Sequence, residues 1–202
     1  MSTTAYLPAR EPKRERGKQR VAALLDAGAA VFAEKGYDAA TMTEIASHAG
    51  AAIGSLYQFF PSKEALAEAL FDRFAERVAV AFARVEELAP GCSARELADL
   101  LVDHKLKQRA DRDAAIALSS AVASVVERRQ PLGDAVRGRI AAILRAGNPV
   151  LGEDEAAAAA IIVNQVMKMI PALASTEDLR AATLIAEARK LLSLYIDEVL
   201  RR

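Results

Sequence analysis

Apolar residues recur at helical spacing along most of the chain, and Gly, Pro and capping residues separate the runs. The longest run extends from Ser62 to about Leu88 and stops at the Pro90-Gly91 pair. No segment alternates apolar and polar residues in the way a half-buried strand does. The pattern therefore predicts an all-α protein. Further helices are expected to start at Ser93, about Asp113, Pro131, about Asp154 and Ser175, the last one running to the C-terminus.

The segment from Thr41 to Leu66 has a different pattern, in which a glycine joins two short helices. The Thr41 hydroxyl can cap the first helix, while Glu44 three residues later can accept from the N–H of Thr41. Gly50 supplies the left-handed turn that ends this helix, because a positive φ costs glycine little. The second short helix is expected over residues 52–60. Two helices joined in this way form a helix-turn-helix.

The second short helix has two unlike faces. Leu56 and Phe60, four residues apart, point to a core, whereas Gly54, Ser55 and Gln58 lie on the other side. A glutamine on an open helix face can pair with the N6 and N7 atoms of adenine in the major groove of DNA. The outer face of this helix is therefore expected to meet bases.

The chain from Val21 to Leu66 resembles the DNA-binding domain of the tetracycline-repressor (TetR) family of transcriptional regulators. The resemblance rests on the helix-turn-helix pattern and on Leu56-Tyr57 followed by Phe60 and Lys63-Glu64 at this spacing. It implies an N-terminal three-helix helix-turn-helix domain followed by an α-helical ligand-binding and dimerisation domain. The expected division is a basic N-terminal arm over residues 1–18, the DNA-binding domain over 19–65 and the helical effector-binding and dimerisation domain over 66–202.

The resemblance also implies which residues contact DNA. Lys63 is expected to anchor a phosphate, because a cation at a helix start is unfavourable for the helix but suits an anion site. At position 52 the family often has a serine that caps the recognition helix, and Ala52 leaves that helix start without such a cap. The full set of expected DNA contacts is Thr43, Ala52, Gly54, Ser55, Tyr57, Gln58, Phe59 and Lys63.

The last two helices carry wide apolar stripes, and the family usually dimerises through two such helices from each subunit. The alternative is that these stripes pack in the core of their own chain. The expected dimer-interface residues are Ile161, Ile162, Val166, Leu184, Ala188, Leu192 and Tyr195.

A small-molecule effector is expected to bind within the C-terminal domain. Aromatic residues are few there, which favours an aliphatic ligand over a stacked planar one. The methionines of this region have a simpler alternative role in core packing. The expected pocket residues are Phe74, Phe82, His104, Asn164 and Met167.

Charge and composition narrow the function further. The 27 basic and 27 acidic residues give zero net charge, yet six basic and two acidic residues lie between Arg10 and Arg20. That run is either a solvated tail or an arm that contacts DNA. The single Cys92 excludes an internal disulfide, and no residue spacing indicates a metal, a cofactor or a catalytic site. Without a signal peptide or a long apolar run, the expected protein is cytoplasmic, has no membrane partner and is not an enzyme.

These observations predict a sequence-specific transcriptional regulator, namely a homodimeric repressor released from a palindromic operator in double-stranded DNA by a small-molecule effector. The alternative is an architectural protein that uses the same DNA-binding domain to organise chromosomal DNA and has no effector switch. An apolar pocket in the C-terminal helices would favour the regulator, and a solid core would favour the architectural protein.

Overall fold

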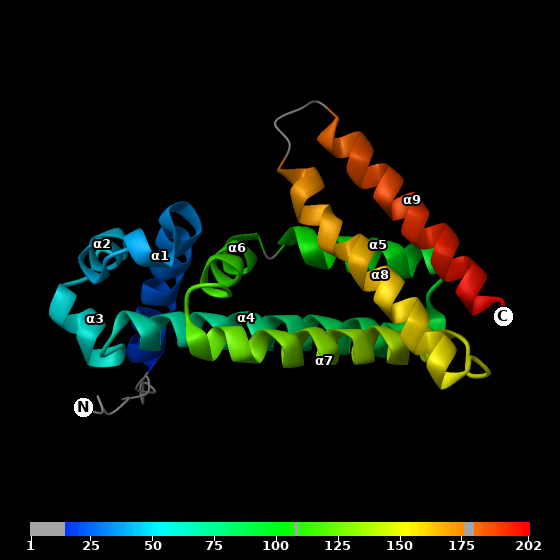
Figure 1. The fold of residues 1–202 in the computed structure, drawn as a ribbon, viewed down its shortest axis with the longest axis horizontal. Coiled ribbons are helices and arrows are strands. Elements are labelled where there is room, and N and C mark those ends of the chain that lie inside the picture. The colour runs from blue at the N-terminus through cyan, green and yellow to red at the C-terminus, as the bar shows by residue number, and fades with distance from the viewer. Residues whose placement is uncertain (1–14, 108, 176–179) are drawn as a thin grey trace. The chain divides into compact units, whose positions relative to one another are not determined.

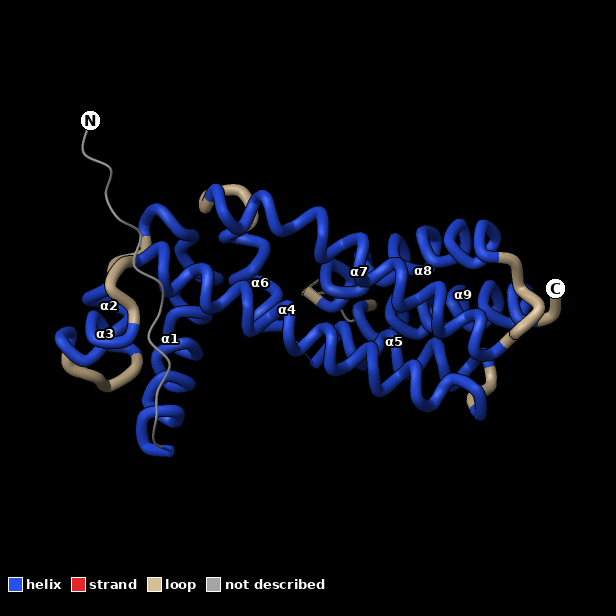
Figure 2. Tube along the Cα trace, turned by 90° about the horizontal axis from the view of Figure 1, so that it is seen from below, coloured by secondary structure: helices blue, strands red, loops and turns tan. Residues whose placement is uncertain are grey.

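The computed structural model describes residues 15–107, 109–175 and 180–202, and within these residues every regular element is a helix (Figure 1). Figure 2 shows the short loops that connect these helices. The all-α class predicted from the sequence is confirmed. The helices are α1 (Glu15–Ala39), α2 (Met42–His48), α3 (Ile53–Phe59), α4 (Lys63–Leu88), a 3-10 turn (Ala89–Gly91), α5 (Ala94–Lys107), α6 (Arg109–Leu118), α7 (Ala123–Gly147), α8 (Glu153–Ala174) and α9 (Ala181–Leu200).

The chain forms two compact units. The first contains the described residues up to Glu76 together with residues 110–130, and the second contains residues 77–109 and 131–202. Helices α4 and α7 each contribute residues to both units. Packing therefore groups the first part of α4, most of α6 and the start of α7 with the three N-terminal helices, whereas the functional division at residue 65 stays a prediction.

The helix-turn-helix of the first unit forms as its local signals predict. The backbone N–H of Glu44 donates to Thr41 Oγ1 (3.2 Å), and the N–H of Thr41 donates to Glu44 Oε2 (3.1 Å), which completes the capping box. Gly50 has a φ of +58° and turns the chain between α2 and α3, which lie beside α1 in Figure 1. Leu56 and Phe60 are both buried, and Ala52 begins α3 without a side-chain cap.

Helix α1 packs closely against the start of α4 at Gly28. A Cβ at position 28 would lie 3.2 Å from a methyl carbon of Leu66 and 3.2 Å from one of Leu70. The missing side chain therefore lets the two helices approach. A second tie comes from Arg73 of α4, whose guanidinium donates to Asp26 of α1 (2.7 Å) and to the buried Asp111 of α6 (2.5 Å). Both ties lie within the first unit.

Lys63, the first residue of α4, has a structural role that the sequence did not indicate. Its Nζ donates to the backbone carbonyls of Tyr37 (2.7 Å), Asp38 (3.2 Å) and Ala40 (3.0 Å) and lies 4.4 Å from the centre of the Tyr37 ring. Tyr37 and Asp38 lie in the last turn of α1 and Ala40 follows it, and carbonyls at a helix end lack intrahelical partners, so a cation there is favourable. The argument that only a phosphate explains this lysine is therefore wrong, because the carbonyls at the end of α1 explain it.

In the second unit, α9 packs against α5 and α8, and Figure 1 shows α8 and α9 side by side. The side of α9 that faces this core carries Ala188, Leu192, Ile196 and Val199, all of which are buried. Two residues of the predicted dimer interface, Ala188 and Leu192, thus belong to the core of their own chain. The opposite side of the helix leaves Leu184, Leu191 and Leu194 exposed.

Three predicted helix limits differ from the structure. Pro131 lies inside α7 instead of starting a helix, and residues 113–129 contain the end of α6 and the start of α7. Both Pro131 and Glu127 are exposed, so water can satisfy the Glu127 carbonyl that loses its intrahelical partner. The last helix begins at Ala181. Residues 176–179, which follow the predicted start at Ser175, lie outside the described residues.

Replacing Lys63 with Ala should lower the free energy of unfolding by about 1.5–3 kcal/mol without DNA, because the charged hydrogen bonds to three carbonyls are lost. Urea unfolding followed by circular dichroism measures this change. Lys190→Ala, at an exposed position without a hydrogen-bond partner among the described residues, is the matched control. Unchanged stability combined with a shallower salt dependence of DNA binding would restore Lys63 as a phosphate anchor.

Leucines 192 and 194 offer a matched test of the two sides of α9. Leu192 is 1% exposed and Leu194 is 61% exposed. Leu192→Ala should reduce the free energy of unfolding by about 2–5 kcal/mol, because it opens a cavity in the core. Leu194→Ala should change it by less than about 0.5 kcal/mol. Equal losses for the two variants in urea titrations would contradict this assignment of the faces.

Candidate nucleic-acid interface and ligand sites

The predicted DNA contacts other than Lys63 lie on α2, on α3 and at the N-cap of α3. Thr43 is exposed in the first turn of α2, and Ala52, Gly54 and Gln58 are exposed at the start and along the length of α3. Tyr57 is 49% exposed, while Ser55 and Phe59 are half-buried. Consecutive turns of one short helix therefore bring most of these side chains to a single accessible surface, which we call the α3 surface.

The Gln58 amide on the α3 surface is available for recognition. It is exposed and has no hydrogen-bond partner among the residues that the structure describes. Its N–H groups and its carbonyl oxygen can therefore both be used by a base edge. Ile53, beside these residues, is 40% exposed, so part of its side chain packs and part remains accessible.

Gly54 is not required by the packing of the protein. A Cβ built at position 54 would meet no atom within 4 Å. A side chain there would instead extend from the α3 surface. A glycine at this position suits a close approach of the backbone to another molecule.

The charges near the α3 surface are mostly used within the protein. Helix α3 itself has no charged residue, and Lys35 donates to Glu44 (2.8 Å). The hydrogen bonds from Lys35 and then from Thr41 lower the pKa of Glu44 to about 2, so this carboxylate stays ionised. The exposed Arg16 and Arg20 near the start of α1 have no acidic partner among the described residues. Both arginines lie in the basic run between Arg10 and Arg20, but the sequence analysis did not include them among the expected DNA contacts.

The five residues of the predicted effector pocket do not line one cavity. Phe82 and His104 meet edge to face, with ring centres 5.2 Å apart, and Phe82 lines an apolar pocket of about 40 Å³ with Val78 and Leu132. Burial, followed by the charge of Lys105, lowers the pKa of His104 to about 4, so its imidazole is neutral near pH 7.

The other three predicted pocket residues lie elsewhere. Met167 is fully buried in the core of the second unit. Asn164 lines a separate groove between α7 and α8. Phe74 belongs to the first unit, where its ring centre is 6.5 Å from that of Phe71. Helical spacing did not reveal these separations, because it does not say which neighbouring helix a face meets.

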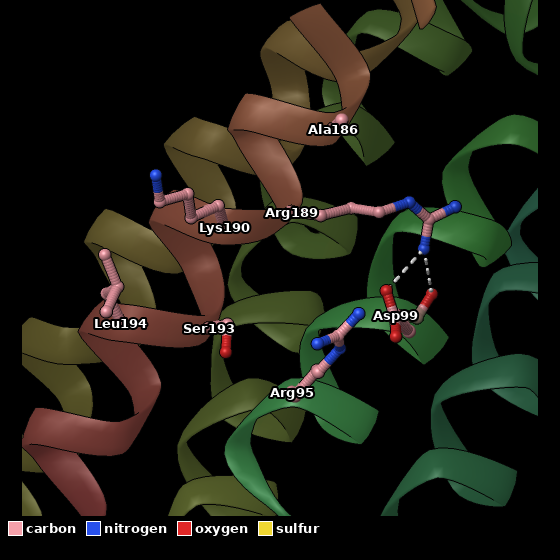
Figure 3. Close-up of a pocket in the computed structure, with 7 residues that line it drawn as sticks. All are labelled: Arg95, Asp99, Ala186, Arg189, Lys190, Ser193 and Leu194. Atoms are coloured by element: carbon pink, nitrogen blue, oxygen red, sulfur yellow. Dashed lines mark hydrogen bonds and ion pairs between the residues drawn. The ribbon is translucent and has the colours of Figure 1, made fainter. Parts of the chain in front are cut away.

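A larger groove of about 340 Å³ lies between α5 and α9 (Figure 3). Arg189 extends from α9 toward α5 and donates to Asp99 Oδ1 (2.9 Å) and to Asp103. Lys190 and Leu194 point away from α5. The ion pairs of Arg189 therefore fasten α9 to α5, and this groove did not follow from the sequence.

Comparison with known proteins matches most of the chain to one family. Residues 24–70 match bacterial regulatory proteins of the tetR family, and residues 92–195 match the tetracyclin repressor-like C-terminal domain. The chain is 36% identical over 78 residues to the HTH-type transcriptional repressor KstR of Mycolicibacterium smegmatis, which covers 39% of this chain and 38% of KstR. It is 42% identical over 60 residues to the A-factor receptor protein of Streptomyces griseus, covering 30% of this chain and 22% of that protein.

The fold agrees with solved structures along nearly the full chain. A transcriptional regulator of the TerR/AcrR family from Aquifex aeolicus has a TM-score of 0.71 at 18% identity, over 87% of this chain and 98% of that one. The matches to these two sequences span less than two fifths of those proteins, so they do not show that this chain shares their ligands. With its N-terminal and C-terminal regions both matched, the chain belongs to the TetR family of bacterial transcriptional regulators.

Proposed function

We propose that the chain is a homodimeric repressor that binds a palindromic operator through α3 and leaves it when a small-molecule effector binds. The observation that carries the proposal is the α3 surface, where Gln58 is exposed without a partner among the described residues and Gly54 has no packing role. Membership of a family of transcriptional regulators favours this function over an architectural one. A regulator of bacterial DNA also implies a cytoplasmic location.

In this proposal α3 enters the major groove and each side chain has a separate task. Gln58 reads an adenine edge, and the absence of a side chain at Gly54 lets the helix backbone approach. Thr43 and Tyr57 reach phosphates or base edges with their hydroxyls. Ala52, Ser55 and Phe59 complete the surface that meets the groove.

Helix α3 has no charged residue, so the positive charge that attracts DNA phosphates must come from other elements. Lys63 would have to release at least one carbonyl before it could bind a phosphate, because its three donors already have acceptors. Arg16 and Arg20 are accessible near the start of α1, where Arg16 lies in the predicted basic arm and Arg20 follows it. These arginines are the better candidates for phosphate contacts, and Lys63 acts mainly by holding the start of α4 against the end of α1.

The dimer requires an exposed apolar face, and α8 has one. Its inner side is buried, yet Ile162 is 48% exposed and Met169 is 53% exposed on the outside, and the half-exposed Ile161 lies at the edge of this face, where it borders the groove shared with α7. An exposed apolar face of this kind is often an interaction surface. By length and composition α8 could also span a membrane, a test that core helices of soluble proteins pass as well. We propose that a second copy of the chain covers this face of α8. The exposed Leu184 and Leu191 of the neighbouring α9 would take part in the same interface.

The pocket beside Phe82 would have to open before it could hold an effector. The pocket beside Phe82 has a volume of about 40 Å³, whereas sites for small organic ligands usually enclose about 300–1,000 Å³. An effector would therefore select a more open state of this region. Phe82 and Val78 of the pocket lie on α4, the same helix that begins at Lys63 beside the DNA-binding helices, so a ligand that displaces α4 can act on the head. The effector must bind the state that leaves DNA more tightly, since otherwise it shifts nothing.

Gln58→Ala should reduce affinity for the operator by about 1–3 kcal/mol and relax the preference at one base pair in each half-site. Binding is measured on the operator and on variants of each base pair at fixed salt. Gly54→Ala should fold normally but weaken binding to all sequences, because the added methyl group lies on the α3 surface. If Gln58→Ala kept the base preference of the original chain, Gln58 would not read a base, and the proposal would lose its main support.

Ile162→Asp should dissociate the dimer, because the new carboxylate would be desolvated against the second copy. Sedimentation should show a monomer with a normal helical circular dichroism spectrum, and operator affinity should fall because one head holds one half-site. Val150→Asp places the same charge at a position that is 83% exposed and serves as the control. An Ile162→Asp protein that stays dimeric would place the interface elsewhere.

A further inference from the structure

A groove between α7 and α8 has the features of a separate ligand site. Its volume is about 180 Å³, and it lies within the second unit. Arg137 lines it from α7, and Ile161, Asn164, Gln165 and Lys168 line it from α8. The lining contains two cations, two amides, one apolar side chain and no carboxylate. It shares no lining residue with the pocket beside Phe82.

Asn164 is the most informative residue of this groove. It is 4% exposed and its side-chain amide has no hydrogen-bond partner among the residues that the structure describes. Among the described residues the buried side-chain atoms without a partner include Arg73 Nε and no atom of Asn164, so the small exposed part of Asn164 includes its amide. Since Asn164 lines the groove, its amide can pair with water or with a ligand that enters there.

The charges of the groove indicate the kind of ligand. Arg137 is already ion-paired with Asp134, one turn earlier on α7. Lys168 is exposed and has no anionic partner among the described residues, and it stands four residues after Asn164 on the same edge of α8. The groove therefore presents about one unbalanced positive charge beside the Asn164 amide, and the half-exposed Ile161 supplies an apolar wall.

We infer that this groove binds a small monocarboxylate that also carries a hydroxyl group. The carboxylate would meet the Lys168 ammonium and the edge of the Arg137 guanidinium, the hydroxyl would pair with the Asn164 amide, and the carbon chain would lie on Ile161. The volume is below the about 300–1,000 Å³ that is usual for drug-sized ligands, so the groove suits a small ligand. This inference goes beyond the operator switch, because binding at the groove requires no DNA.

The test measures binding of 3-hydroxybutyrate to the full chain without DNA. Two-dimensional NMR follows the side-chain amide of Asn164, which a ligand in the groove should shift. Butyrate lacks the hydroxyl and butyramide lacks the charge, so the first should bind more weakly than 3-hydroxybutyrate and the second should not bind detectably. Lys168→Gln keeps the length of the exposed side chain but removes its charge, and should weaken binding by about tenfold or more. Lys190→Gln, on α9, is the matched control and should bind as the original chain does.

A second variant, Asn164→Leu, tests the amide itself, with thermal unfolding to verify that the protein still folds. Loss of the discrimination between 3-hydroxybutyrate and butyrate in this variant supports the site. No shift of the Asn164 amide with 3-hydroxybutyrate, or equal binding by the original chain and Lys168→Gln, overturns the inference while leaving operator binding untouched. If 3-hydroxybutyrate binds but operator affinity stays the same, the site stands and the effector of the proposed switch binds elsewhere.

Discussion

The ammonium group of Lys63 is the contact on which the arrangement of the DNA-binding helices depends. It takes three carbonyls at the end of α1 as acceptors, and these carbonyls have no partners within the helix. Tyr37 beneath the ammonium stacks on the buried Phe32 of α1, with ring centres 5.8 Å apart. The start of α4 is therefore fixed to α1 at the point where the chain enters and leaves the helix-turn-helix. The position of α3 relative to α1 follows from this attachment and from the buried Leu56 and Phe60.

Arg73 extends the attachment of α4 further along the first unit. It joins Asp26 of α1 to Asp111 of α6, and Asp111 is almost completely buried. The Nε atom of Arg73 is buried and has no partner among the described residues, so the hydrogen-bonding capacity of this guanidinium is not fully used. Removing one member of a buried pair leaves the other charge without compensation, which is more costly than the pair is worth. Ion pairs of Arg73, as well as apolar packing, thus join α1, α4 and α6 within the first unit.

Helices α8 and α9 each have a buried side and a side with exposed apolar residues. Helix α9 buries Leu192 against its own chain and fastens to α5 through the Arg189 pairs with Asp99 and Asp103. Helix α8 buries Val163, Met167 and other residues on its inner side yet leaves isoleucines outside. The core of the second unit therefore covers one side of each helix, and apolar side chains on the other side are exposed.

Local signals in the sequence determined the helix-turn-helix, because each acts over a few residues. The Thr41–Glu44 capping box, the left-handed turn at Gly50 and the buried pair Leu56 and Phe60 all agree with the structure. The tertiary structure alone decided the partners of Lys63, which lie 23 to 26 residues earlier in the chain. It also decided that Leu192 faces the core and that Asn164 opens into a groove beside Arg137. Helical spacing shows which residues share a face, but when several faces are apolar it cannot show which of them another helix covers.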